Sequence, residues 1–266
     1  MKRMIKWVSL GIGVYLAALI ITMPATVAWQ LAGDRVPARL VAPKGTVFSG
    51  SAQSIAWPEG GRIDGVRWSF QPVGLLTGAA AMRIEGQLRG SPLAGTVRYR
   101  PWPGMQLRNA QFDGPLDELL ITLRHEPAAE MVEGELSVDL EAFTMAGNRL
   151  AGASGVMTWR NARAGFGGTR FAFGELTLRL KPDQAGQGAT GKISSRGGEI
   201  DISGDLELDA DRDFQLVTRI GGDGPPNDAT RQLRTLLGLS GDGNGRIQVS
   251  GNWRDNQFTL EQVERD

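Results

Sequence analysis

The sequence predicts a mainly β protein: an N-terminal transmembrane helix followed by a large antiparallel, meander-like periplasmic β-sheet domain with one or two short helices. Three observations predict this fold class. Apolar and polar residues alternate over several segments, Gly and short polar turns separate those segments, and the chain opens with one long uncharged stretch. Strict alternation indicates strands with one buried and one solvated face, which is typical of antiparallel sheets.

The uncharged stretch predicts a single membrane span over residues 7–29. It contains no charge as far as Gln30 and is preceded by three basic residues, Lys2, Arg3 and Lys6. About 20 apolar residues in a helix cross the core of a bilayer. Lysine and arginine before the span put residues 1–6 in the cytoplasm. We therefore expect a single-pass protein of the inner membrane of a Gram-negative cell, with its C-terminal domain in the periplasm.

A cleaved signal peptide is the alternative interpretation of this segment. Small residues at Thr26-Val27-Ala28 offer a cleavage site. The apolar run is longer than the 7–15 residues of a usual signal core, which favours an anchor. Both interpretations export the remainder of the chain.

The exported part divides into a linker over residues 30–44, with Pro37 and Pro43, and one β-rich domain over residues 45–266. Within that domain the period of two recurs between glycines and short polar turns, which predicts successive hairpins. The alternating segments lie near residues 82–89, 136–141, 176–180, 200–209, 214–220 and 247–253.

Two short helices interrupt the predicted strands. One begins at an N-cap, Asn227 or Asp228, and ends at Gly238, with leucines spaced one helical turn apart at 233, 236 and 237. A second helical turn is predicted over Pro72–Leu76. An open sheet of this size must also close, cover or use its edges, and pairing with a partner strand is a recurrent use.

The composition argues against several classes of chemistry. The chain has no Cys and one His, His125, so thiol catalysis, imidazole-based hydrolysis and zinc binding lack their residues. The charges balance at 29 basic and 29 acidic residues, which argues against nucleic-acid binding. We expect no enzymatic activity, no catalytic residue, no cofactor, no metal and no small-molecule substrate.

The remaining polar motifs have ordinary structural explanations. Carboxylates such as Asp201, Asp205 and Glu207 fall on the polar positions of alternating strands, so a solvated face explains them better than a catalytic pair. The glycine-rich acidic loops at 221–224 and 241–245 resemble turns, because the second lacks the glutamate that completes a calcium loop.

Five tryptophans lie in the exported part: Trp57, Trp68, Trp102, Trp159 and Trp253. A tryptophan on an alternating strand is expected to fill the core. Trp102 lies between Pro101 and Pro103 in a predicted loop, and it is the candidate for contact with a partner.

The succession of Gly, aromatic and Pro positions is also informative. Gly45-Thr46-Val47-Phe48-Ser49-Gly50 is followed by Trp68-Ser69-Phe70-Gln71-Pro72 and by Leu75-Leu76-Thr77-Gly78, and later by Trp159, Asn161-Ala162, Gly197-Gly198 and Gly204-Asp205-Leu206. This order resembles the N protein of the type II secretion system, the general secretion pathway protein N (GspN) family. Phe48 departs from the family, which usually has Trp there, but keeps an aromatic ring.

The resemblance implies an accessory part of the inner-membrane platform that exports folded proteins across the outer membrane. It implies other inner-membrane type II secretion subunits as partners, and no catalytic residue or cofactor. The leading alternative is a periplasmic lipid-binding or lipid-transfer protein, because a long curved sheet with one apolar face can form a groove for acyl chains. An uncovered apolar face would support that alternative.

Overall fold

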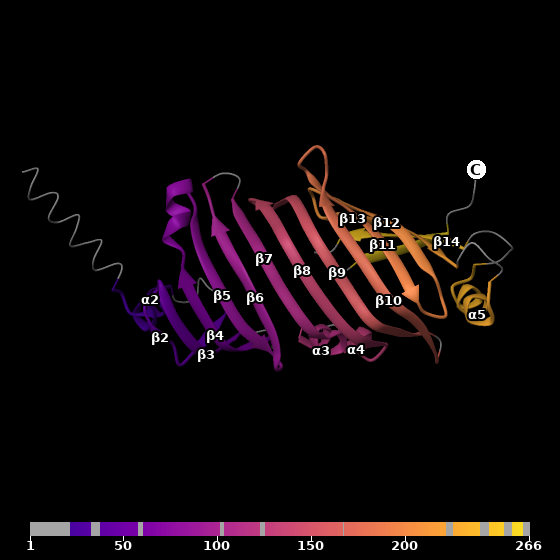
Figure 1. Cartoon of the computed structure of the whole chain (residues 1–266), viewed down its shortest axis with the longest axis horizontal. Helices are drawn as coiled ribbons and strands as arrows, with labels where there is room; N and C mark the ends of the chain where they lie inside the picture. The colour runs from indigo at the N-terminus through magenta and orange to yellow at the C-terminus, as the bar shows by residue number, and fades with distance from the viewer. Residues whose placement is uncertain are drawn as a thin grey trace, which may run out of the picture.

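The computed structural model describes residues 22–32, 38–57, 61–101, 104–122, 126–166, 168–221, 226–239, 245–252 and 257–262. Their main feature is one 15-stranded antiparallel sheet, in which the strands follow chain order from β1 through β3 to β15 and β2 lies beside β3 (Figure 1). The predicted mainly β, meander-like sheet is therefore confirmed. The strands are β1 (Arg39–Val41), β2 (Lys44–Gly45), β3 (Ser49–Ala56), β4 (Arg62–Phe70), β5 (Ala80–Leu88), β6 (Ser91–Tyr99), β7 (Met105–Pro115), β8 (Val132–Ala146), β9 (Arg149–Phe166), β10 (Thr169–Pro182), β11 (Gly188–Gly197), β12 (Ile202–Asp209), β13 (Asp213–Ile220), β14 (Arg246–Asn252) and β15 (Gln257–Gln262).

Short helices lie at the ends and rims of this sheet: α2 (Ala25–Ala32), the 3-10 helix η2 (Pro72–Thr77), α3 (Leu116–Thr122), α4 (Glu126–Ala129) and α5 (Asp228–Leu236). Both helices predicted from the sequence are present. Asn227 is the N-cap of α5, and its side chain accepts a hydrogen bond from the Thr230 backbone N–H. Helices α3 and α4 were not predicted, although Pro115 and the acidic first turn of α3 are recognised start signals.

The N-terminal segment of the described chain packs against the start of the sheet. Pro24 forms an antiparallel bridge with Thr46, and Ala25 is buried at the start of α2. Within the described ranges, no helix combines the length and hydropathy needed to cross a bilayer. Most of the predicted 7–29 span lies outside the described residues, and its last residues, from Pro24, belong to this packed segment.

The predicted linker contributes to the sheet. The three residues of β1 pair with the C-terminal half of β3, with Arg39 opposite Ala56. β2 pairs with the other end of β3. Residues 39–41 and Lys44, predicted as linker, are therefore strand residues at the edge of the sheet. Their backbone groups form hydrogen bonds with β3. The two prolines of this segment had instead suggested a linker without strand pairing.

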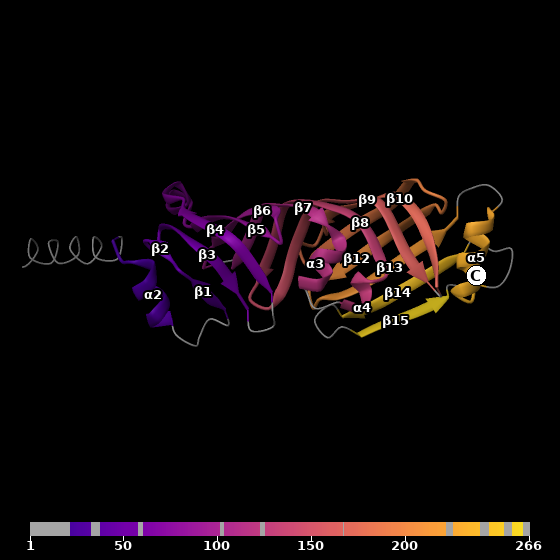
Figure 2. The same cartoon turned by 90° about the horizontal axis from the view of Figure 1, so that it is seen from below.

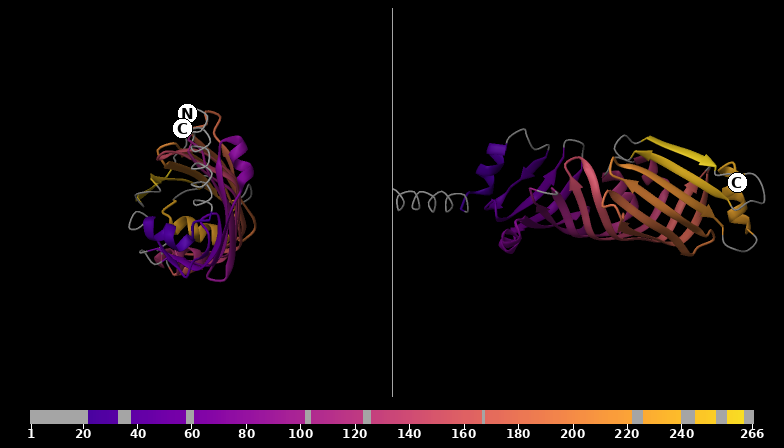
Figure 3. Two further views of the ribbon diagram at one scale, coloured as in Figure 1. Left: turned by 90° about the vertical axis from the view of Figure 1, so that its left-hand side faces the viewer. Right: turned by 90° about the horizontal axis from the view of Figure 1, so that it is seen from above.

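The sheet is strongly curved, so that an end-on view shows an open trough (Figure 3). Bulges in β4, β7 and β9 coincide with register shifts and with left-handed backbone at Gly65, Asn109 and Asn161, whose φ angles are 58°, 48° and 50°. A bulge bends its strand and increases the local twist. Gly and Asn tolerate this conformation better than other residues.

The largest buried cluster lies at the C-terminal end of the trough, where α5 covers the sheet (Figure 1). Leu233 of α5 is 2% exposed and packs among Phe171 and Phe173 of β10, Ile220 of β13 and Ile247 of β14. Leu236, one turn away, is 46% exposed. The helix thus buries one apolar side and closes this end.

Candidate interaction surfaces

The two sequence motifs at the start of the sheet form one packed unit. The Trp68 indole N–H donates a hydrogen bond to the Thr46 carbonyl oxygen at 3.0 Å. The indole ring covers Gly50, where an added Cβ would lie 2.4 Å from Cζ2. The Phe48 and Phe70 rings meet edge to face, with centroids 5.1 Å apart. Glycine at position 50 and the aromatic residues around it are therefore explained by packing.

The inner face of the trough carries a continuous band of apolar side chains. One row crosses six adjacent strands, because each residue is the register partner of the next: Leu93, Phe112, Val138, Met157, Leu178 and Ile193. All six are half-buried. Among the described elements no second sheet covers this band, so its side chains pack against one another and stay partly open to solvent.

A hollow of about 870 Å³ opens at the rim of this apolar face. Tyr99 and Met105, which are register partners on β6 and β7, line it and are 60% and 53% exposed. Leu150 at the start of β9 lies beneath them and is 1% exposed. The hollow therefore has an apolar floor and an apolar mouth.

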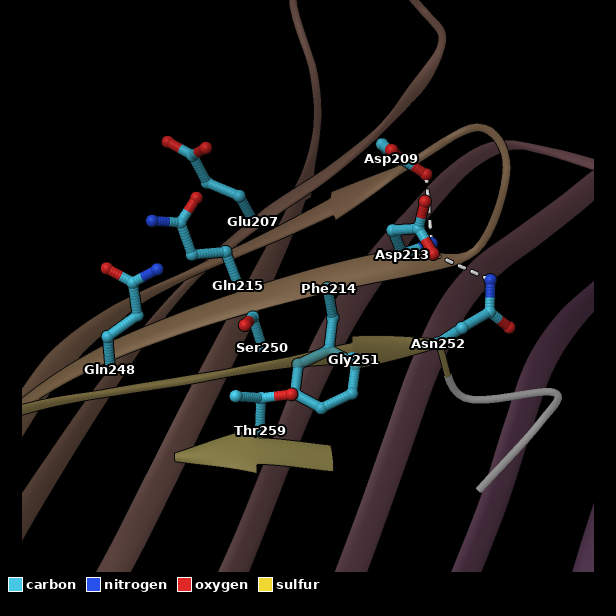
Figure 4. A pocket seen from close by; sticks show the side chains of 10 residues that line it. All are labelled: Glu207, Asp209, Asp213, Phe214, Gln215, Gln248, Ser250, Gly251, Asn252 and Thr259. Atoms are coloured by element: carbon cyan, nitrogen blue, oxygen red, sulfur yellow. Dashed lines mark hydrogen bonds between the residues drawn. The ribbon is translucent and has the colours of Figure 1, made fainter. Parts of the chain in front are cut away.

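A second hollow, of about 470 Å³, lies over β12, β13, β14 and β15 and is lined mainly by polar residues (Figure 4). Glu207, Gln215 and Phe214 are among the residues that line it, and the Phe214 side chain leaves its strand in the opposite direction to the other two. The turn at its rim is held by its own side chains: Asp209 Oδ1 accepts the Asp213 backbone N–H at 3.0 Å. Asp213 Oδ1 in turn accepts from the Asn252 side-chain amide at 2.7 Å, so both of these aspartates have structural partners.

Neither hollow holds a cluster of side chains of the kind that binds a metal ion. Over the described ranges, no group of three or more His, Cys, Asp or Glu side chains converges as a metal site would require. The chain has no Cys at all. What these surfaces offer is apolar contact area, backbone hydrogen-bonding groups and scattered charge.

The last strand provides an edge. Among the described strands, β15 pairs with β14 on one side only, and it lies at the margin of the sheet (Figure 2). Thr259, in the middle of β15, is exposed. The opposite edge is formed by β1, which has three residues. The longer edge is therefore the one that can accept a partner strand.

Some of the residues singled out from the sequence lie in the described part of the chain, and others lie outside it. Trp68 and Trp159 are half-buried on strands, and the Trp159 indole N–H donates to the Glu133 carbonyl oxygen at 3.1 Å, as expected of structural side chains. Trp102, His125 and Trp253 lie outside the described residues, as do most residues of the loops at 221–224 and 241–245.

The exposed side of η2 is a further surface, and it was not predicted from the sequence. Val73, Leu75 and Leu76 are 72%, 58% and 87% exposed. The sequence does contain a signal for this exposure. Two adjacent leucines in a turn flanked by glycines do not fit the alternation of a strand, so neither is assigned to a buried face. These three side chains form the most exposed apolar group in the described part of the chain.

Comparison with known proteins gives one result. Residues 37–250, most of the chain, match the model of the family described as type II secretion system (T2SS), protein N. The matched range begins two residues before β1 and ends within β14, so it includes nearly the whole sheet. No curated protein and no solved structure matches the chain.

Proposed function

Because the chain belongs to the type II secretion system protein N family, we propose that it is an accessory subunit of the inner-membrane secretion platform, anchored by a single N-terminal span with its sheet in the periplasm. In this role it assists the export of folded proteins by binding other inner-membrane secretion subunits. Involvement in type II secretion follows from family membership. The accessory role, the anchor and the partner class are the proposal.

The observation that carries the scaffold role is the form of the domain. It is a single sheet of 15 strands with large open surfaces, and among the described strands β15 pairs on one side only. Edge strands attract other strands through their unpaired backbone groups, and proteins that keep such an edge uncovered commonly use it for binding. A scaffold needs contact area of this kind and no reactive residues, so we also propose that the protein is not an enzyme.

The test is site-specific crosslinking in cells that export a type II substrate. A photoreactive p-benzoylphenylalanine at Thr259, on the β15 edge, is expected to crosslink to inner-membrane secretion subunits. The matched control is Thr190, an exposed threonine in β11, which has strand neighbours on both sides. Equal crosslinking at both positions, or none at either with secretion intact, would contradict binding through the β15 edge.

A second candidate function, binding of lipid acyl chains, is favoured by the half-buried apolar row on the inner face. Soluble proteins rarely leave large continuous apolar areas open to water. The matched pair is Met157→Lys, within that row, and Val156→Lys, on the opposite face and 37% exposed. Phospholipid that co-purifies in stoichiometric amount and is lost only in Met157→Lys would favour this function. Co-purification of secretion subunits without lipid would favour the scaffold.

A further inference from the structure

The balanced total charge conceals an uneven distribution along the chain. Residues 38–111 contain nine lysines and arginines and three acidic residues, whereas residues 112–266 contain sixteen and twenty-five. Because the strands follow chain order, this difference separates the two ends of an elongated sheet (Figure 1). Charge asymmetry between the parts of a chain is a recognised indication of interaction with a charged surface.

The basic residues of the N-terminal part gather on one face. Arg83 and Ala81 are two residues apart in β5, so their side chains share a face. Arg98 on β6 is the register partner of Ala81, and Arg108 on β7 is the partner of Thr96, which itself lies opposite Arg83. This is the outer face, opposite the apolar band.

Few carboxylates neutralise this face. Arg67 of β4 lies opposite Glu85, and Glu85 forms its ion pair with Arg83 at 2.7 Å. Within the described residues, Arg67, Arg98 and Arg108 have no carboxylate oxygen within ion-pair distance. The outer face of β4 to β7 therefore presents uncompensated positive charge.

The exposed apolar residues of η2 lie on that same face. A Cβ added at Gly74 would lie 3.2 Å from the Ala81 Cβ, so η2 packs on the side of β5 that carries Arg83. Backbone hydrogen bonds hold the turn in place: the Gln71 N–H donates to the Ala81 carbonyl and the Ala79 N–H donates to the Gly74 carbonyl, at 2.8 and 2.9 Å. It projects from the rim of the sheet between β4 and β5 (Figures 1 and 2).

We propose that this surface, formed by η2 and the arginines on the outer face of β4 to β7, docks on an anionic phospholipid bilayer. Val73, Leu75 and Leu76 insert at the level of the headgroups, and Arg67, Arg98 and Arg108 contact lipid phosphates. Apolar insertion next to clustered basic residues is the combination that holds proteins at anionic membrane surfaces. Charge complementarity distinguishes this partner from a neutral apolar one. The predicted N-terminal anchor brings the same end of the sheet to the bilayer, and the docking does not depend on the secretion role.

The absence of cysteine makes the test direct. Leu76→Cys, labelled with the environment-sensitive fluorophore NBD, is compared with Glu207→Cys at the acidic end, in the full chain reconstituted into nanodiscs. The discs contain phosphatidylcholine alone or phosphatidylcholine with one third phosphatidylglycerol. In the second kind, NBD at position 76 is expected to shift to shorter wavelength and to be quenched by spin-labelled lipid, while NBD at position 207 stays water-exposed in both. Raising the salt to 1 M, where the Debye length is about 3 Å, should reverse the shift.

Matched charge reversals complete the experiment. The triple substitution R67E/R98E/R108E is expected to abolish the shift at position 76, since each basic residue near an anionic surface strengthens binding roughly fivefold. R179E/K181E/R196E, at three exposed basic residues elsewhere, is expected to leave it. A water-like signal at position 76 in discs that contain phosphatidylglycerol would overturn the proposal, as would a shift insensitive to R67E/R98E/R108E. A shift that needs added secretion subunits would identify the surface as a protein interface instead.

Discussion

Substituting alanine for Gly50 tests the packed unit that begins the sheet. The new Cβ would lie 2.4 Å from Trp68 Cζ2 and 2.5 Å from the Lys44 carbonyl oxygen, both well inside van der Waals contact. Relieving this overlap costs about 1–3 kcal/mol, the usual penalty for overpacking. Moving the indole also breaks its hydrogen bond to Thr46, at about 1 kcal/mol. Alanine in a strand recovers about 0.5–1 kcal/mol relative to glycine, which leaves a net destabilisation of about 2 kcal/mol.

The control is a glycine with room for a methyl group. At Gly165 in β9 the nearest atom to an added Cβ is the Met131 carbonyl oxygen, at 3.7 Å. Gly165→Ala is therefore expected to be neutral or to stabilise the protein by up to about 1 kcal/mol. Urea denaturation of the full chain in detergent, followed by circular dichroism, measures both variants.

The difference between the two glycines tests the packing argument. Equal stability of Gly50→Ala and Gly165→Ala would refute it. In a Trp68→Leu background the cost of Gly50→Ala should fall but not vanish, because the Lys44 carbonyl remains in place.

Three further predictions concern α5 and the distribution of stability. Leu233→Ala is expected to cost about 2–5 kcal/mol because it empties a buried position. Leu236→Ala, one turn further along the helix and 46% exposed, should change the free energy of unfolding by less than about 0.5 kcal/mol, and urea denaturation distinguishes the two variants. Asn227→Ala should cost about 1 kcal/mol through loss of the N-cap, and the same change at Asp228, which does not cap, should cost less. Backbone amides of β5 to β7 should exchange with solvent faster than those of β9 to β13, because the buried clusters lie among the later strands; slower exchange in β5 to β7, measured by mass spectrometry, would contradict this.

Alternation of apolar and polar residues was enough to predict an antiparallel meander, because each strand has one face toward the trough and one toward solvent. It could not predict the bulges, since Asn109 and Asn161 look like ordinary polar positions until the register of their neighbours is known. The inner face was predicted to be buried, but Leu93 and Met157 on that face are only half-buried. A period of two reports which face a residue is on, but not whether another layer covers that face.

The candidate surfaces were harder to predict for a related physical reason. Trp68 and Trp159 were expected to be structural, and their indole N–H groups are satisfied by backbone carbonyls. The exposed leucines of η2 lie where a short turn interrupts the alternation, so no periodicity assigns them to a face. The distribution of arginine between the two ends has physical meaning only once chain order is known to equal strand order.

Burial divides the domain into two parts with different roles. Both hydrophobic clusters lie in the later strands, where α5 adds Leu233 to the core. The earlier strands are held by the aromatic packing around Trp68 and by the sheet's own hydrogen bonds, and they carry the exposed leucines and the uncompensated arginines. A packed C-terminal half can fix the curvature of the whole sheet through continuous register, while the lighter N-terminal half leaves its outer face open. Substitutions in the C-terminal core should therefore reduce stability throughout the domain, whereas substitutions on the outer face of β4 to β7 should change binding and leave stability nearly unaltered.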